Sequence, residues 1–172
     1  MKIFKQIQKI TEYGLSTRDR QREINVSEVF HLWNHLSQRY NVIHITNIFK
    51  NFATDDELKV ILDLGIKILG KHVVILEKEM TAYAIPLPLR PPKQVQCTTD
   101  LEALTDRHIF RRVSRGIQSF LPTHTMAFIH SNSAKIRELF MLFLIEEMKL
   151  YDKMAEYGRI KSYEITAPVY RN

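Results

Sequence analysis

Two histidines that share one helix face are the first residues of this sequence that could do chemistry. His31 and His35 are four residues apart and could bind one metal ion together. In a four-helix bundle whose second and third helices run parallel, three further side chains would lie at a similar depth. The candidate metal ligands are then His31, His35, His72, His124 and Glu138. The simpler interpretation is that His31 and His35 flank Trp33 and are solvent-exposed.

A complete di-iron centre is not expected. Such centres need a Glu-x-x-His motif on each of two helices and a glutamate on each of two others. Glu28 and His31 form the single Glu-x-x-His of the chain, and Leu69 stands three residues before His72. We therefore expect no cofactor, with a divalent metal as the alternative.

Two ionisable residues interrupt apolar helix seams. His72 lies four residues after Ile68, and Glu147 lies four residues after Phe143. Buried charges cost several kcal/mol unless they are paired. The buried polar core is predicted to contain Tyr40, His72 and Glu147. This polar core would be a functional polar site or a structural contact. We favour the structural contact, in which His72 pairs with Glu147 or with Tyr40 and fixes the register of the helices.

Four arginines form a positive stripe in the third expected helix. They are Arg107, Arg111, Arg112 and Arg115. The stripe could bind an anionic surface or nucleic acid, or it could be solvated or paired with acids such as Glu138 and Asp152. No nucleic-acid recognition motif accompanies it, so we do not expect nucleic-acid binding.

The sequence offers no catalytic constellation. It has no Gly-x-Ser-x-Gly and no glycine-rich phosphate loop, and its single cysteine, Cys97, lies in a proline-rich stretch without a nearby histidine. We name no catalytic residues and expect that the protein is not an enzyme.

Apolar periodicity predicts the elements that position these residues. Four helices are expected, over about 25–53, 54–80, 100–130 and 134–157, with caps at Ser27 and Thr54 and a left-handed end at Gly158. Pro122 should kink or split the third helix. Four prolines between 86 and 92 exclude a helix from the stretch 84–101.

The predicted fold is an all-α, ferritin-like four-helix bundle, in which a long proline-rich crossover joins two antiparallel hairpins. A simple up-down bundle is the alternative. Residues 1–24 are predicted to be a short amphipathic helical arm and a polar linker, and residues 25–172 the bundle domain with an irregular C-terminal tail.

Composition narrows the class of protein. The 172 residues contain one cysteine and five glycines, which argues against a disulfide framework and a Rossmann sheet. No apolar run is long enough to span a membrane, and residues 1–6 lack the apolar region of a signal peptide, so an intracellular protein is expected. The net charge of +6 comes largely from the arm and the arginine stripe.

Several segments resemble a family of spore-forming bacilli similar to spore coat protein F. They are Val26-Ser27-Glu28 through Leu32-Trp33, Lys71-His72, Glu77-Lys78-Glu79-Met80, Ile85-Pro86-Leu87-Pro88, the stretch Glu146 to Tyr151, and the tail with its proline and tyrosines. The resemblance covers residues 24–172. It implies a ferritin-like bundle associated with the spore, and it brings no activity and no catalytic residues.

Two functions are therefore expected as alternatives. The first is a structural spore coat protein that acts in sporulation by packing against other spore coat proteins or against copies of itself, through the arm and the tail. The second is a metal-binding bundle that uses His31, His35 and His72.

Overall fold

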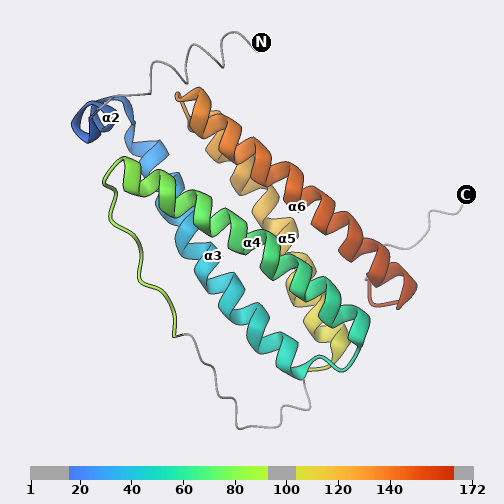
Figure 1. Ribbon diagram of the computed structural model, residues 1–172. Coiled ribbons are helices and arrows are strands. Elements are labelled where there is room, and N and C mark those ends of the chain that lie inside the picture. Colours follow the sequence, from blue (N-terminus) through green and yellow to red (C-terminus); the bar gives the residue numbers. More distant parts are fainter. Residues whose placement is uncertain (1–15, 93–103, 165–172) are drawn as a thin grey trace, which may run out of the picture.

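The computed structural model describes residues 16–92 and 104–164, and within these ranges it contains helices joined by loops and no strand. The helices are α2 (Thr17–Glu23), α3 (Val26–Phe52), α4 (Asp56–Ala82), α5 (Asp106–His130) and α6 (Ala134–Ile160). The four long helices form one bundle, and α2 lies at the end where α3 begins (Figure 1). No helix in the described ranges has the length and apolarity needed to cross a membrane.

Side-chain caps explain where the first two long helices begin. Asn25 caps α3 in a capping box, in which its side chain accepts from the Glu28 amide and Glu28 accepts from the Asn25 amide. Asp55 caps α4 by accepting from the amides of Glu57 and Leu58. The predicted caps, Ser27 and Thr54, were therefore wrong by one or two residues.

Contacts at the two ends of the bundle settle its connectivity. The Thr54 amide donates to Asp106 Oδ1 at 2.8 Å, so α5 begins where α3 turns into α4. Gln21 Nε2 donates to the Tyr83 carbonyl at 3.0 Å, so α4 ends where α3 begins. Helices α4 and α5 therefore run parallel, and the chain between them spans the bundle. The parallel course of these two helices excludes the simple up-down alternative, and a single long crossover is the connection that ferritin-like bundles use.

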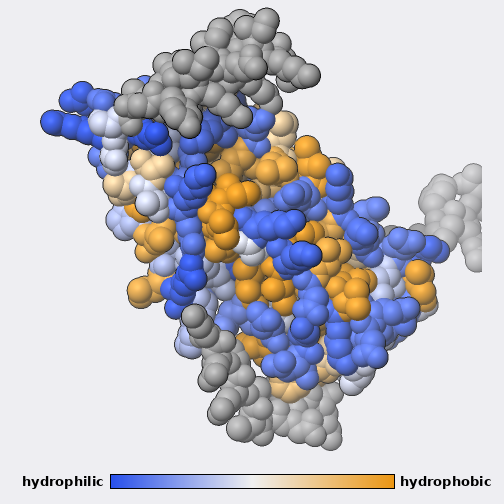
Figure 2. Space-filling view, in the orientation of Figure 1, coloured by the Kyte–Doolittle hydropathy of each residue, from blue (hydrophilic) through white to orange (hydrophobic). Residues whose placement is uncertain are grey.

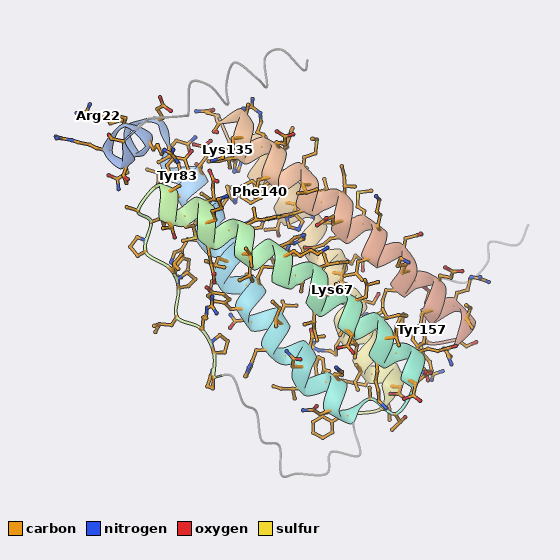
Figure 3. The ribbon with its side chains drawn as sticks, viewed as in Figure 1. Arg22, Lys67, Tyr83, Lys135, Phe140 and Tyr157 are labelled. Carbon is orange, nitrogen blue, oxygen red and sulfur yellow. The ribbon has the colours of Figure 1, made fainter. Side chains whose placement is uncertain are left out.

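Two apolar clusters fill the bundle, one toward each end. The proximal cluster lies near the beginning of α3 and consists of Leu32, Leu36, Tyr40, Leu76, Met80, Tyr83, Ala127, Ile136, Leu139, Phe140 and Phe143. The distal cluster lies near the end of α3 and consists of Ala53, Leu58, Leu62, Ile109, Phe110, Met154 and Tyr157. Figure 3 labels Phe140 and Tyr157, which mark the two clusters at opposite ends of α6.

The core face of α3 agrees only in part with the spacing of its apolar residues, which predicts a buried seam of Val29, Trp33, Leu36, Tyr40 and Ile43. Leu36 and Tyr40 are buried, whereas Trp33 is exposed and the other two are only half-buried. The buried face also carries histidines and an arginine, which apolar spacing did not identify.

Three local expectations also need correction. Residues 17–23 form α2 and not a polar linker, because Ser16 accepts from the Asp19 amide and caps the helix. Helix α5 begins at Asp106, six residues later than predicted, and it continues through Pro122 as one helix. The predicted arm helix within residues 1–15 lies outside the described residues.

Gly158 does not end α6. It lies inside the helix, which continues to Ile160, and the left-handed residue is Ser162, with φ 56°. A Cβ atom at Gly158 would overlap the Phe110 ring. The glycine therefore permits close packing between α5 and α6, which is a different role from the one predicted.

Candidate functional site: a buried polar layer

A charged layer lies between the two apolar clusters, and each long helix contributes one side chain to it. We call Arg39 of α3, His72 of α4, His124 of α5 and Glu147 of α6 the polar layer. Each of these residues is buried, with at most 2% of its surface exposed. Four helices therefore meet at one level through groups that carry or can carry charge.

Glu147 is the centre of the layer. Arg39 Nη2 donates to Glu147 Oε1, and His124 Nε2 lies 3.0 Å from the same oxygen. His72 Nδ1 lies 3.7 Å from it. The other ring nitrogen, His72 Nε2, lies 2.6 Å from Glu146 Oε2, so His72 is hydrogen-bonded to Glu146 and only close to Glu147.

The Arg39–Glu147 ion pair keeps its charges although both side chains are buried. Burial lowers the pKa of Arg39 to about 10, with Glu147 opposing the shift, so the guanidinium stays protonated at neutral pH. Burial alone would raise the pKa of Glu147, but the hydrogen bond from His124 and the charge of Arg39 outweigh it and lower that pKa. The layer thus holds one positive and one negative charge.

The buried histidines are neutral at pH 7. Burial lowers the pKa of His72 to about 4, helped by the charge of Arg39. Burial also lowers the pKa of His124, although Glu147 opposes the shift. With neutral histidines, the positive and negative charges of Arg39 and Glu147 balance, as burial requires.

His35 and His31 extend the polar layer toward the beginning of α3. His35 Nδ1 lies 2.6 Å from the His31 carbonyl and donates to it, and burial lowers the pKa of His35 to about 2. The ring of His35 lies 5.1 Å from that of His124 and 4.6 Å from that of Phe140. His31 Nε2 lies 3.1 Å from His130 Nδ1. Both histidines are buried, so the expectation that they flank Trp33 in solvent was wrong.

The predicted metal ligands do not come together as one site. His35 and His124 are neighbours and His124 reaches Glu147, but His31 pairs with His130, and Glu138 is exposed. Within residues 16–92 and 104–164, no three histidine, cysteine or acidic side chains are grouped so that they could hold a metal ion. Metal binding by His31, His35 and His72 thus stays a prediction that the geometry does not support.

The predicted polar core is present in part. His72 and Glu147 lie close together, but Tyr40 is not bonded to either of them. The Tyr40 hydroxyl donates to Glu77 Oε1, which also accepts from Arg90 of the segment that follows α4. This contact fastens the beginning of the crossover to the bundle.

The sequence reasoning missed Arg39, the largest side chain that is fully buried. Arginine is read as a surface residue, since it is almost never fully buried unless it is paired. A signal was present, because Arg39 lies four residues after His35 and seven after Leu32 and so shares their face. A second buried residue, Glu28, was also not predicted to have a structural role. Glu28 accepts a hydrogen bond from the Ser133 amide at 2.7 Å and so joins the beginnings of α3 and α6.

The arginine stripe is only partly free for an external partner. Arg107 Nη2 donates to the Ser162 carbonyl at 3.1 Å, and Arg111 Nε donates to the Tyr163 carbonyl at 3.0 Å. These two arginines hold the segment after α6 against α5. Arg112 and Arg115 are exposed.

The arrangement is suited to joining helices more than to converting a substrate. Its charges are paired, its histidines are neutral, and its side chains are closed to bulk solvent. Removing one partner of such a pair costs about 3–5 kcal/mol, because the other charge stays buried without compensation. We interpret the polar layer as a device that sets the register of all four helices.

Comparisons with known proteins agree with the fold. A family model described as "Protein of unknown function (DUF3231)" matches residues 13–171. A crystal structure of a "putative spore coat protein" from Bacillus halodurans C-125 superposes with a TM-score of 0.81 at 22% identity, covering 87% of this chain and 96% of that one. A conserved hypothetical protein from Mycobacterium tuberculosis superposes with a TM-score of 0.64 at 11% identity, covering 76% of this chain and 96% of that one. No curated protein matches the sequence.

Proposed function

The chain belongs to the DUF3231 family, and from this premise we propose that it is a non-enzymatic, spore-associated protein that works by packing against other proteins. The name of the Bacillus halodurans neighbour supports the spore association. The sequence supports the non-enzymatic part, because it lacks nucleophile and phosphate-binding motifs.

A row of exposed apolar side chains on α6 carries the packing part of the proposal. The α6 row consists of Met141, Leu142, Ile145 and Met148, which are 41–53% exposed. Their spacing places them together on one outer face, opposite the core residues Phe140 and Phe143. A contiguous apolar surface rimmed by polar residues is typical of a protein–protein contact. Figure 2 shows hydrophobic surface exposed between hydrophilic side chains over α4 and α6.

A second exposed apolar face supports the same proposal. Val26, Phe30 and Trp33 share the outer face of α3 and are 86%, 59% and 43% exposed. A chain with two such faces can contact two neighbours at once, as an assembly of a coat requires.

The test follows a fluorescent fusion of the full chain in a sporulating bacillus. The wild-type fusion is expected to remain with purified spores after washing. A variant with all four residues of the α6 row changed to serine should lose this retention. The matched control changes Val60 and Val74, exposed apolar residues of α4, to serine and should be retained.

Two outcomes would contradict the proposal. The wild-type fusion could be absent from purified spores, which removes the spore association. Retention of the α6-row variant at the wild-type level would remove the row as the contact surface. Circular dichroism of each purified variant shows whether the bundle is intact.

A further inference from the structure

A cavity of about 190 Å³ lies between the polar layer and the distal cluster. Its deep wall is apolar and comes from α4 and α6, through buried side chains that include Leu62, Leu69, Leu150 and Met154. An apolar cavity of about 150 Å³ in another protein stays dry and binds benzene. The volume and the lining are therefore adequate for part of an apolar ligand.

The cavity opens to solvent between α3 and α5. Among its lining residues, only Ile45 of α3 and Arg112 and Gly116 of α5 are exposed. A Cβ atom at Gly116 would meet nothing within 4 Å, so the space beside this glycine is open. This opening between α3 and α5 is therefore the mouth of the cavity.

Charge decides which end of a ligand lies inside. The polar groups at the inner end are Arg39 and Glu147, which already neutralise one another. A further charge at that depth would be buried without a partner, which costs several kcal/mol. The inner part of the ligand must therefore be uncharged and apolar.

The mouth offers the opposite environment. Arg112 is exposed there and makes no hydrogen bond or ion pair with any residue in the part of the chain that the structure describes. A guanidinium binds a carboxylate or phosphate through two parallel hydrogen bonds. The mouth thus suits an anionic group that stays in contact with water.

We propose that this cavity binds a single-chain amphiphile, whose alkyl chain lies among Leu62, Leu69 and Leu150 and whose anionic head pairs with Arg112. The inference is independent of the proposed function, because it rests on the interior of the bundle and not on the α6 row.

Calorimetric titration of the full chain tests the proposal with three ligands that share a ten-carbon chain, the two ionic ones below their micellar concentrations and the alcohol below its solubility limit. Decanoate is expected to bind more tightly than decanol, and decyltrimethylammonium least tightly. Binding of the cation as tightly as decanoate, or no binding of decanoate at millimolar concentration, would overturn it.

Matched substitutions locate the site. Gly116→Trp should close the mouth and weaken decanoate binding at least tenfold. Gly70→Trp places the same side chain on α4 at another position where the structure has open space, and it should leave the affinity within twofold. Equal affinity of the two variants would overturn the location.

A second pair tests the head group. Arg112→Gln should weaken decanoate binding about tenfold and leave decanol binding unchanged. Arg115→Gln removes an exposed arginine of the same helix that does not line the cavity, and should leave both unchanged. An equal effect of the two substitutions on decanoate would overturn the role of Arg112. Thermal melting of each variant without ligand shows that the bundle is intact.

Discussion

The proximal and distal clusters hold the same four helices together, but they border on different neighbours. The proximal cluster borders on the polar layer, through Phe143, whose ring stacks on His72 at 4.0 Å. The distal cluster borders on the cavity, which Leu62 and Met154 also line. One half of the interior therefore borders directly on paired polar side chains, and the other half borders on a cavity.

This difference predicts different weaknesses. Substitution of one member of a buried ion pair should lower the stability strongly, because the other charge stays buried without a partner. Apolar side chains beside a cavity can shift to accommodate a substitution, except where two helices are already in close contact. In the distal half, Gly158 of α6 and Phe110 of α5 meet at such a point.

The largest expected effect comes from removing the central carboxylate. Glu147→Leu leaves Arg39 buried without its partner, so the free energy of unfolding should fall by roughly 3–5 kcal/mol. Urea denaturation followed by circular dichroism measures it. The double variant Arg39→Met with Glu147→Leu should regain most of the loss. A double variant less stable than the single one would contradict the importance of charge pairing.

A smaller loss is expected from overpacking the distal half. In Gly158→Ala the added methyl group would overlap the Phe110 ring, so the free energy of unfolding should fall by about 1–3 kcal/mol. Thermal melting measures the change, and adding Phe110→Leu should relieve it. The control is Gly70→Ala, whose methyl group meets open space and should stabilise α4 by about 0.5–1 kcal/mol. Equal melting temperatures for Gly158→Ala and the control would contradict close packing.

The smallest effect is a dependence of stability on pH near neutrality, which comes from buried histidines. The folded-state pKa values of His35 and His72, about 2 and about 4, lie below the ordinary value of 6.5. Below pH 6.5 the unfolded chain therefore takes up protons that the folded chain does not, and stability falls toward pH 4. The expected loss between pH 7 and pH 6 is of order 1 kcal/mol.

Urea denaturation at several pH values measures this slope. His35→Leu should reduce it, whereas Gly158→Ala should lower stability at every pH and leave the slope unchanged. A slope that His35→Leu does not alter would show that other groups cause the acid sensitivity.

Much of the fold could be predicted because helix ends and apolar spacing are local signals. Short connections between predicted helices gave the two hairpins, and four prolines in seven residues marked the crossover. Phe143, which lies on the apolar seam predicted for the fourth helix, is buried as expected. Gly158 was misassigned because a glycine near a helix end resembles a C-cap, and only the position of Phe110 shows its packing role.

The site was harder to predict because its members are polar and distant in sequence. His72 and Glu147 stood out as polar interruptions of apolar seams, and the structure places them together. Arg39 was not predicted to be buried, because the apolar spacing placed Trp33 in the core, and Trp33 lies on a different face of α3 from Arg39. A buried arginine is identified only once its carboxylate is known, and Glu147 lies 108 residues further along the chain.

That separation also bears on the order in which the molecule assembles. Each hairpin closes through a connection of three residues and can form early from local contacts, whereas the polar layer requires both hairpins. Closing a long loop costs entropy before its contacts repay it, so docking of the hairpins should come late in folding. The Arg39–Glu147 pair would then form after the rate-limiting barrier and act as a latch that slows unfolding while hardly affecting the folding rate.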